Sequence, residues 1–69
     1  MPLTLANAGD KLKVKRVGGD PKTKKFLENL GFVTDADITV ISFIEGNAIV
    51  NVKGTRIGIS KEMAQKIIV

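Results

Sequence analysis

Apolar and polar side chains alternate along two stretches of the chain, the pattern expected of β-strands with one buried face. In the first stretch, Leu12 and Val14 alternate with lysines, so one face of this strand is apolar and the other is charged. The second stretch covers residues 37–59 and is interrupted at Glu45-Gly46-Asn47 and at Lys53-Gly54-Thr55. Both interruptions have the composition of tight turns, so this stretch is predicted to fold as three consecutive strands.

The first strand of this second stretch is apolar on both faces. Ile38 and Val40 fall on one face, whereas Ile41 and Phe43 fall on the other. A strand of this kind is either packed on both sides or lies at a surface that another molecule covers. Together with Ile49 of the following strand, Ile41 and Phe43 therefore have two interpretations. They complete the core, or they form an apolar surface that docks a partner.

A helix is predicted over residues 21–30. Asp20 is a favourable N-cap, and Pro21 fits the first helical position because the N–H that proline lacks would be unpaired there. The apolar side of the helix is formed by Phe26, Leu27 and Leu30. Gly31 can adopt the left-handed conformation that ends a helix, and Phe32 can then fold back on the last turn.

The last residues predict a helical turn and a closing strand. Ser60 is a suitable cap for a turn near residues 61–66, and Ile67-Ile68-Val69 is apolar enough to pair as a strand. About five short strands with one helix make a mainly β chain, and such strands are best satisfied by closing into a small barrel. The length of 69 residues makes one domain, residues 1–69. No segment has the roughly 20 apolar residues that span a bilayer and no secretory signal is recognised, so a cytoplasmic protein is expected.

Positive charge is concentrated in the first third of the chain. The formal net charge is +4, with seven basic and two acidic residues in residues 1–25 and four basic and five acidic residues in residues 26–69. Six lysines of the first segment are candidate partner-binding residues: Lys11, Lys13, Lys15, Lys22, Lys24 and Lys25. A concentrated positive face attracts an acidic protein surface, anionic lipid or nucleic acid. The alternative interpretation is a solvated strand edge whose lysines prevent pairing with another chain.

The residues that most enzymes and transition-metal sites use are absent. The chain has no histidine and no cysteine, so it offers no general base near neutral pH and no thiolate. Asp35 and Asp37 would share one face of a strand, but aspartate is common in turns and we interpret both as exposed turn residues. The sequence therefore predicts no enzyme activity, no catalytic residue, no metal ligand and no cofactor.

Nucleic-acid binding is the main alternative to protein binding. The lysines could neutralise phosphates, but the chain has no tryptophan or tyrosine on which bases could stack. Of the three phenylalanines, Phe26 and Phe32 occupy positions that should be buried, which leaves Phe43. A single aromatic side chain is a poor platform for single-stranded nucleic acid.

Four segments of the chain carry a family resemblance when they are taken in order. They are the opening Leu3 to Val17 with its Gly9-Asp10 turn, the helix end Phe26-Leu27-Glu28-Asn29-Leu30-Gly31-Phe32, the hairpin Val50-Asn51-Val52-Lys53-Gly54-Thr55-Arg56-Ile57-Gly58-Ile59-Ser60, and the closing Lys61 to Val69 with Glu62, Ala64, Ile67 and Val69 in place. Over nearly the whole chain they resemble the FeoA family, the small ferrous iron transport protein A. The chain departs from the family pattern at Thr34-Asp35-Ala36, where Pro-Gly is usual, and at Phe26, where arginine is frequent.

The resemblance implies both a fold and a role. The implied fold is an SH3-like barrel. The implied role is that of a non-enzymatic accessory protein in bacterial ferrous iron uptake, which acts through the FeoB-type membrane permease and its cytoplasmic G domain. A small basic barrel that binds nucleic acid is the alternative function.

Overall fold

The computed structural model describes all residues, 1–69, as a mainly β domain with six short strands. In chain order its elements are η1 (Leu3–Leu5, a 3-10 turn), β1 (Lys11–Lys13), β2 (Arg16–Val17), α1 (Pro21–Asn29), β3 (Asp37–Ile44), β4 (Asn47–Val52), β5 (Thr55–Ile59), α2 (Lys61–Ala64) and β6 (Ile67–Ile68). The mainly β class, the helix near residues 21–30 and the helical turn after Ser60 are confirmed. The chain has one strand more than the sequence pattern predicts.

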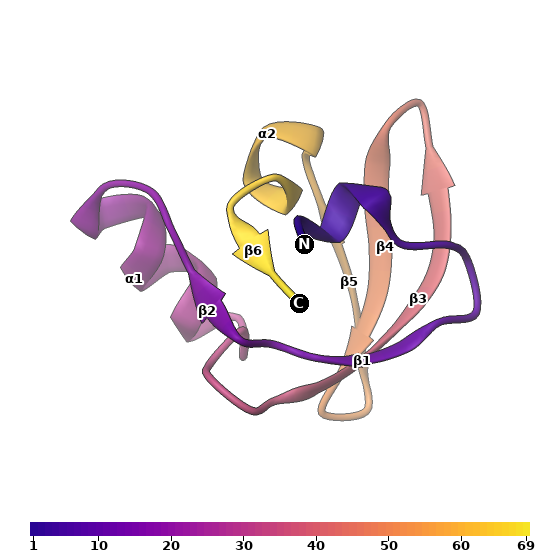
Figure 1. The fold of residues 1–69 in the computed structure, drawn as a ribbon, viewed down its shortest axis with the longest axis horizontal. Helices are drawn as coiled ribbons and strands as arrows, with labels where there is room; N and C mark the ends of the chain where they lie inside the picture. The colour runs from indigo at the N-terminus through magenta and orange to yellow at the C-terminus, as the bar shows by residue number, and fades with distance from the viewer.

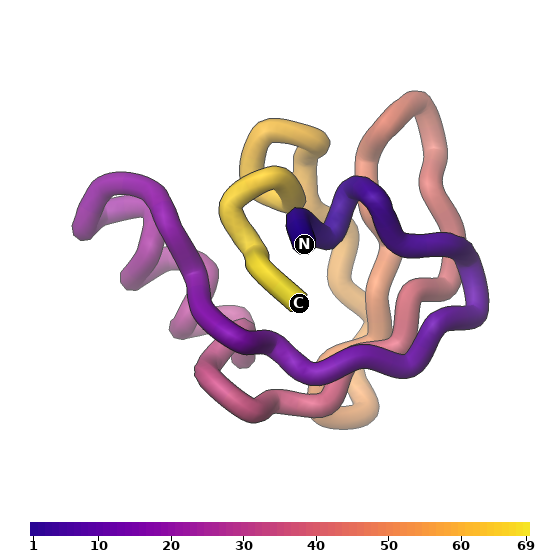
Figure 2. Tube along the Cα trace, viewed as in Figure 1, coloured from indigo at the N-terminus to yellow at the C-terminus, as the bar shows by residue number.

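The strands form a large sheet and a small sheet (Figure 1). The large sheet has four antiparallel strands in the order β1-β3-β4-β5, and the small sheet pairs β2 with β6. Figure 2 shows the N-terminal segment running around the rim of the molecule, where it supplies first β1 and then β2. The N–H of Val69 donates to the carbonyl of Met1 over 2.8 Å, so the two termini lie side by side.

The end of helix α1 is fixed by a Schellman cap. Gly31 has a φ of +109°. Its N–H donates to the Glu28 carbonyl over 3.0 Å, and the N–H of Phe32 donates to the Leu27 carbonyl over 3.1 Å. Leu27 and Phe32 are both fully buried, which supplies the apolar contact that accompanies this cap. The predicted return of Phe32 onto the helix end is therefore confirmed.

Two-residue turns connect β3 to β4 and β4 to β5. Glu45 and Gly46 have φ values of 52° and 85°, and Lys53 and Gly54 have φ values of 53° and 79°. Positive φ at both central residues defines the type I′ turn, whose twist matches that of the flanking strands. Both predicted hairpins are confirmed.

A β-bulge interrupts β3. The register of β3 against β4 shifts between Val40 and Ser42, which makes Ile41 an extra residue in the strand. Because of this extra residue, Phe43 returns to the core-facing side, where it pairs with Ala48 and packs against the core. The prediction that Phe43 shares a face with Ile41 is therefore wrong, since period-two alternation assumes an uninterrupted strand.

Fifteen apolar side chains form one buried core, and no polar side chain is buried. The inner face of the large sheet supplies Ile38, Val40, Ala48, Val50, Val52 and Ile59. The other elements and the connecting segments supply Leu3, Ala6, Val14, Val17, Leu27, Phe32, Ala64, Ile67 and Val69. Phe26 was predicted to be buried beside Leu27 but is 47% exposed, because successive side chains of a helix are turned by about 100°.

Candidate partner-binding surfaces

The six candidate lysines are all exposed and lie on different elements. Together they are called the lysine surface: Lys11 and Lys13 on β1, Lys15 in the connection to β2, and Lys22, Lys24 and Lys25 on α1. In Figure 1, α1 lies at the left-hand end of the molecule and β1 along its lower edge. The lysine surface therefore has a sheet part and a helix part.

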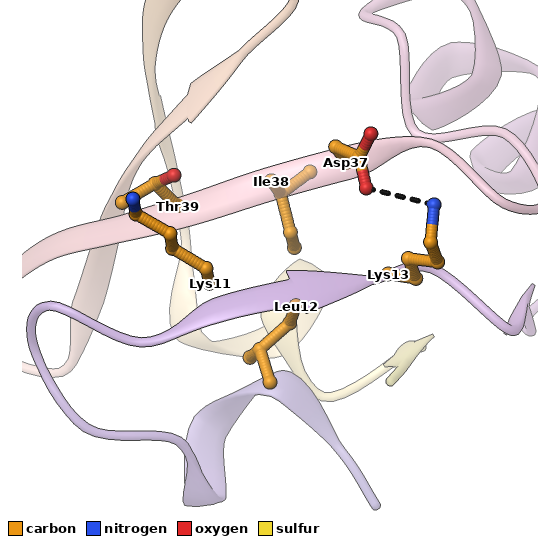
Figure 3. Close-up of a pocket in the computed structure, with 6 residues that line it drawn as sticks. All are labelled: Lys11, Leu12, Lys13, Asp37, Ile38 and Thr39. Atoms are coloured by element: carbon orange, nitrogen blue, oxygen red, sulfur yellow. Dashed lines mark hydrogen bonds and ion pairs between the residues drawn. The ribbon is translucent and has the colours of Figure 1, made fainter.

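In the sheet part, one of the two lysines is paired with an acidic side chain. Lys13 lies opposite Asp37 in the β1–β3 ladder, and its Nζ is 2.9 Å from Asp37 Oδ1 (Figure 3). The hydrogen bond to Asp37, and then the charge of that carboxylate, raise the pKa of Lys13. The two side chains are 65% and 81% exposed, so water screens the pair and it adds little to stability. Lys11, which lies opposite Thr39, has no such partner.

A shallow depression of about 280 Å³ lies between β1 and β3. Its lining residues are Lys11, Leu12, Lys13, Asp37, Ile38 and Thr39 (Figure 3). The lining combines two cations with one carboxylate and contains no nucleophile beside a base. The depression therefore offers a mixed apolar and charged surface for contact and no nucleophile–base pair.

The two aspartates of the predicted turn have different surroundings. Asp35 is in a turn, with a φ of +69°, and its N–H donates to the Val14 carbonyl over 2.7 Å. Asp37 is the first residue of β3 and faces Lys13 across the ladder, so its interpretation as a turn residue is wrong. No three potential metal ligands lie close enough to share an ion. None of the helices has the length and apolar character needed to cross a membrane.

The helix part places lysines where the helix dipole is positive. The Asp20 side chain accepts a hydrogen bond from the Thr23 N–H over 2.8 Å and caps the helix, and this bond lowers the pKa of Asp20. The first turn contains no acidic residue but carries Lys22 and Lys24. Cations at this end of a helix are unfavourable for stability. The helix dipole therefore does not favour the charges of these two lysines.

The predicted apolar surface is smaller than the sequence suggests. Ile41 and Ile49 lie on the outer face of the large sheet, and the bulge places Ile41 and its neighbour opposite Ile49. Both are half-buried and neither belongs to the core. We call this pair the outer apolar patch. Phe43, the third predicted member, is on the opposite side of the sheet.

Other apolar side chains are more exposed than those of the patch. They are Leu5 (66% exposed), Ile44 (58%), Met1 (48%) and Phe26 (47%). Ile44 is not among the residues that the sequence predicts to be exposed. Its position one residue after Phe43 and directly before a turn is nevertheless a signal of exposure. Phe26 and Leu27 are adjacent on a helix and so point in different directions, which is a signal that Phe26 is exposed when Leu27 is buried.

This arrangement of short strands belongs to the class of SH3-like barrels. The domain superposes with a TM-score of 0.86 on the FeoA protein of Stenotrophomonas maltophilia, a zinc complex described as a prokaryotic SH3 domain protein, at 20% identity over 100% of this chain and 88% of that chain. The FeoA domain model matches residues 1–69, so the chain belongs to the FeoA family. FeoA domains are non-enzymatic and are associated with ferrous iron transport.

Two further FeoA structures are similar to the whole domain. A crystal structure of an iron uptake regulatory protein, FeoA, has a TM-score of 0.87 and 30% identity over 96% of this chain and 88% of that chain. The solution structure of the FeoA protein from Chlorobium tepidum has a TM-score of 0.89 and 28% identity over 99% of this chain and 67% of that chain. No curated protein sequence matches the chain significantly.

Proposed function

We propose that the chain is a cytoplasmic accessory protein of ferrous iron uptake that binds a FeoB-type permease through the G domain of the permease. The match of the FeoA domain to all of residues 1–69 carries this proposal. A non-enzymatic domain affects transport by binding another molecule, and the function of such a domain resides in its surface. The surface offers two candidates for the contact, the lysine surface and the outer apolar patch.

The helix part of the lysine surface is the favoured contact. Lys22 and Lys24 lie in the first turn of α1, where their charges oppose the helix dipole. Neither is paired with a carboxylate, whereas Lys13 of the sheet part is. Unpaired lysines whose charges the helix dipole does not favour are suited to an acidic protein surface, because complementary charge accelerates association and selects the partner. The outer apolar patch would extend this contact only if the partner also reaches the large sheet.

The proposal is tested by titrating isotope-labelled protein with the soluble G domain of a FeoB-type permease and recording amide shifts. Shifts are expected to cluster on α1 and β1 and to shrink when salt is raised, because screening weakens charge attraction. The test variant carries Lys22→Glu and Lys24→Glu. Its matched control carries Lys53→Glu and Lys61→Glu, which changes the net charge equally at exposed lysines outside the lysine surface.

The two variants separate a specific contact from a general effect of charge. We expect the test variant to weaken binding by about tenfold or more and the control to change it much less. Equal weakening by both variants would show that only net charge matters, which contradicts the proposed contact. Absence of shifts in either salt, with and without nucleotide, would contradict binding to the isolated G domain.

Binding of single-stranded nucleic acid is a second candidate because of Phe26. This side chain is 47% exposed and lies four residues after Lys22 on α1, so one aromatic ring is on the same side of the helix as that lysine. Stacking platforms use several such rings, which makes this the weaker candidate. Fluorescence anisotropy with a labelled oligonucleotide tests it, with Phe26→Ala as the variant. Salt-sensitive binding that Phe26→Ala abolishes would support this candidate, and its absence at low salt would exclude it.

A further inference from the structure

The two edges of the large sheet differ in their protection. Strand β1 has only three residues, two of them lysines, whereas β5 has five residues, Thr-Arg-Ile-Gly-Ile, with one charge. Proteins protect exposed edges with short strands, lysines, prolines or bulges, because a bare edge pairs with another strand. β1 has two of these features, and β5 has no lysine, proline or bulge. Outside the β4–β5 ladder, no hydrogen bond involves residues 55–59.

The type I′ turn before β5 determines which backbone groups face outward. Val52 and Thr55 close the two-residue hairpin as a hydrogen-bonded pair, and the pairs beyond them alternate. Arg56 and Gly58 therefore occupy non-hydrogen-bonded positions relative to β4. Their N–H and C=O groups point away from β4, and both residues are exposed. These two residues give β5 two outward donors and two outward acceptors.

The sequence of β5 is complementary to itself in an antiparallel register centred on Ile57. When Ile57 lies opposite Ile57 of a second copy, Arg56 of each copy lies opposite Gly58 of the other. Each Arg56–Gly58 pair can then exchange two hydrogen bonds, which makes four across the two-fold axis. A register centred on Arg56 would instead place two arginines opposite each other, which is unfavourable.

The side chains fit the same register. Gly58 has no side chain, so Arg56 of the second copy can lie across it on the outer face. A Cβ built at Gly58 would be 3.3 Å from Ile49 Cδ1, so Ile49 borders this space and can cover the methylene groups of the arginine. On the inner face the two Ile57 side chains form a non-hydrogen-bonded pair, the closer of the two antiparallel arrangements.

We propose that two copies of the chain associate through their β5 strands, in the Ile57-centred antiparallel register, to form a continuous eight-stranded sheet. This association does not depend on the proposed binding to the permease. Each copy carries a net charge of +4, so screening by salt should strengthen the association. Binding through the lysine surface has the opposite dependence on salt, which keeps the two proposals separable.

The direct measurement is amide exchange of the wild-type chain as a function of protein concentration. The Arg56 and Gly58 amides should gain protection as the concentration rises, and the gain should be larger at higher salt. Sedimentation at the same concentrations should show a monomer–dimer equilibrium. No change at these two amides up to roughly 1 mM protein, the range of weak association, would overturn the proposal.

Charge substitution at Gly58 tests the register. Gly58→Glu places carboxylates opposite Arg56 and is expected to tighten the dimer about three- to tenfold, whereas Gly58→Lys should weaken it by a similar factor. Both variants add a side chain beside Ile49, so a purely steric effect would shift both in the same direction and would overturn the register. The double variant Arg56→Glu/Gly58→Lys should restore the dimer.

A backbone variant covers the case in which the Gly58 variants do not fold. Arg56→Pro removes an N–H that points away from β4, which edge strands tolerate, and it deletes two of the four intermolecular hydrogen bonds. Its amide spectrum should show a folded monomer at concentrations where the wild-type chain is dimeric. An unchanged monomer–dimer equilibrium in folded Arg56→Pro would overturn the proposal.

Discussion

Gly31 stands where α1 ends and the chain turns toward β3. Its φ of +109° is strained for any residue with a side chain, and a Cβ built there would be 2.9 Å from Val52 Cγ1. Gly31→Ala is therefore expected to lower the free energy of unfolding by about 2–4 kcal/mol, from backbone strain and overpacking together. Gly9→Ala is the matched control, because Gly9 has a φ of +93° and no atom near the added Cβ. Urea denaturation should show the smaller loss for Gly9→Ala, and equal losses would contradict the role of the Val52 contact.

Asp20 gives the stability of the domain a specific pH dependence. The hydrogen bond from the Thr23 N–H holds the pKa of Asp20 below its ordinary value of 3.8. Because the folded-state pKa is the lower one, the stabilisation is present above 3.8 and is lost as the pH falls through the folded-state value. Asp20→Asn should therefore be less stable than the wild type at pH 7 and similar to it in strong acid. Melting temperatures at both pH values check this, and a constant difference would contradict it.

At the scale of elements, the sequence predicts the features that depend on a few adjacent residues, but it does not predict the interruption of a strand by a bulge. The cap of α1 and both hairpins are predictable because each depends on a few adjacent residues. The bulge at Ile41 has no comparable signal, since it requires neither glycine nor a turn residue, yet it changes the face of Phe43. The exposure of the six lysines is also predictable, because lysines are almost always exposed. The division of the lysine surface into two parts depends on the packing of α1, which spacing along the chain does not report.

The bulge predicts unequal costs for two substitutions in one strand. Phe43→Ala should lower the free energy of unfolding by about 2 kcal/mol, less than for a fully buried phenylalanine because Phe43 is half-buried against the core. Ile41→Ala should cost less than about 1 kcal/mol, since Ile41 lies on the outer face. Denaturation midpoints of the two variants check this. A larger cost for Ile41→Ala would place the bulge elsewhere in β3.

At the scale of the whole molecule, the closure of the fold rests on contacts between distant parts of the chain. The small sheet pairs Val17 with Ile67, and Pro2 bridges to Ile68. Strands of two residues carry almost no periodic signal, so the sequence predicts that the C-terminal residues pair but not which strand they join. The size and composition of the chain do predict the low stability of this fold. A domain this small has roughly 3–5 kcal/mol of stability, all of it dependent on one core.

Substitution of Ile67 is expected to remove a large share of the stability of the domain. Ile67 is fully buried, whereas its neighbour Ile68 is half-buried, and both belong to β6. Ile67→Ala is expected to cost about 3 kcal/mol, within the range for a buried isoleucine and close to the whole stability of the domain. Ile68→Ala, which removes the same atoms from the other side of the strand, should cost about 1 kcal/mol and leave the domain folded. Amide spectra at 37 °C should therefore show a large unfolded population for Ile67→Ala alone. Equal unfolding of both variants would mean that β6 contributes through its backbone pairing and not through the side chain that it buries.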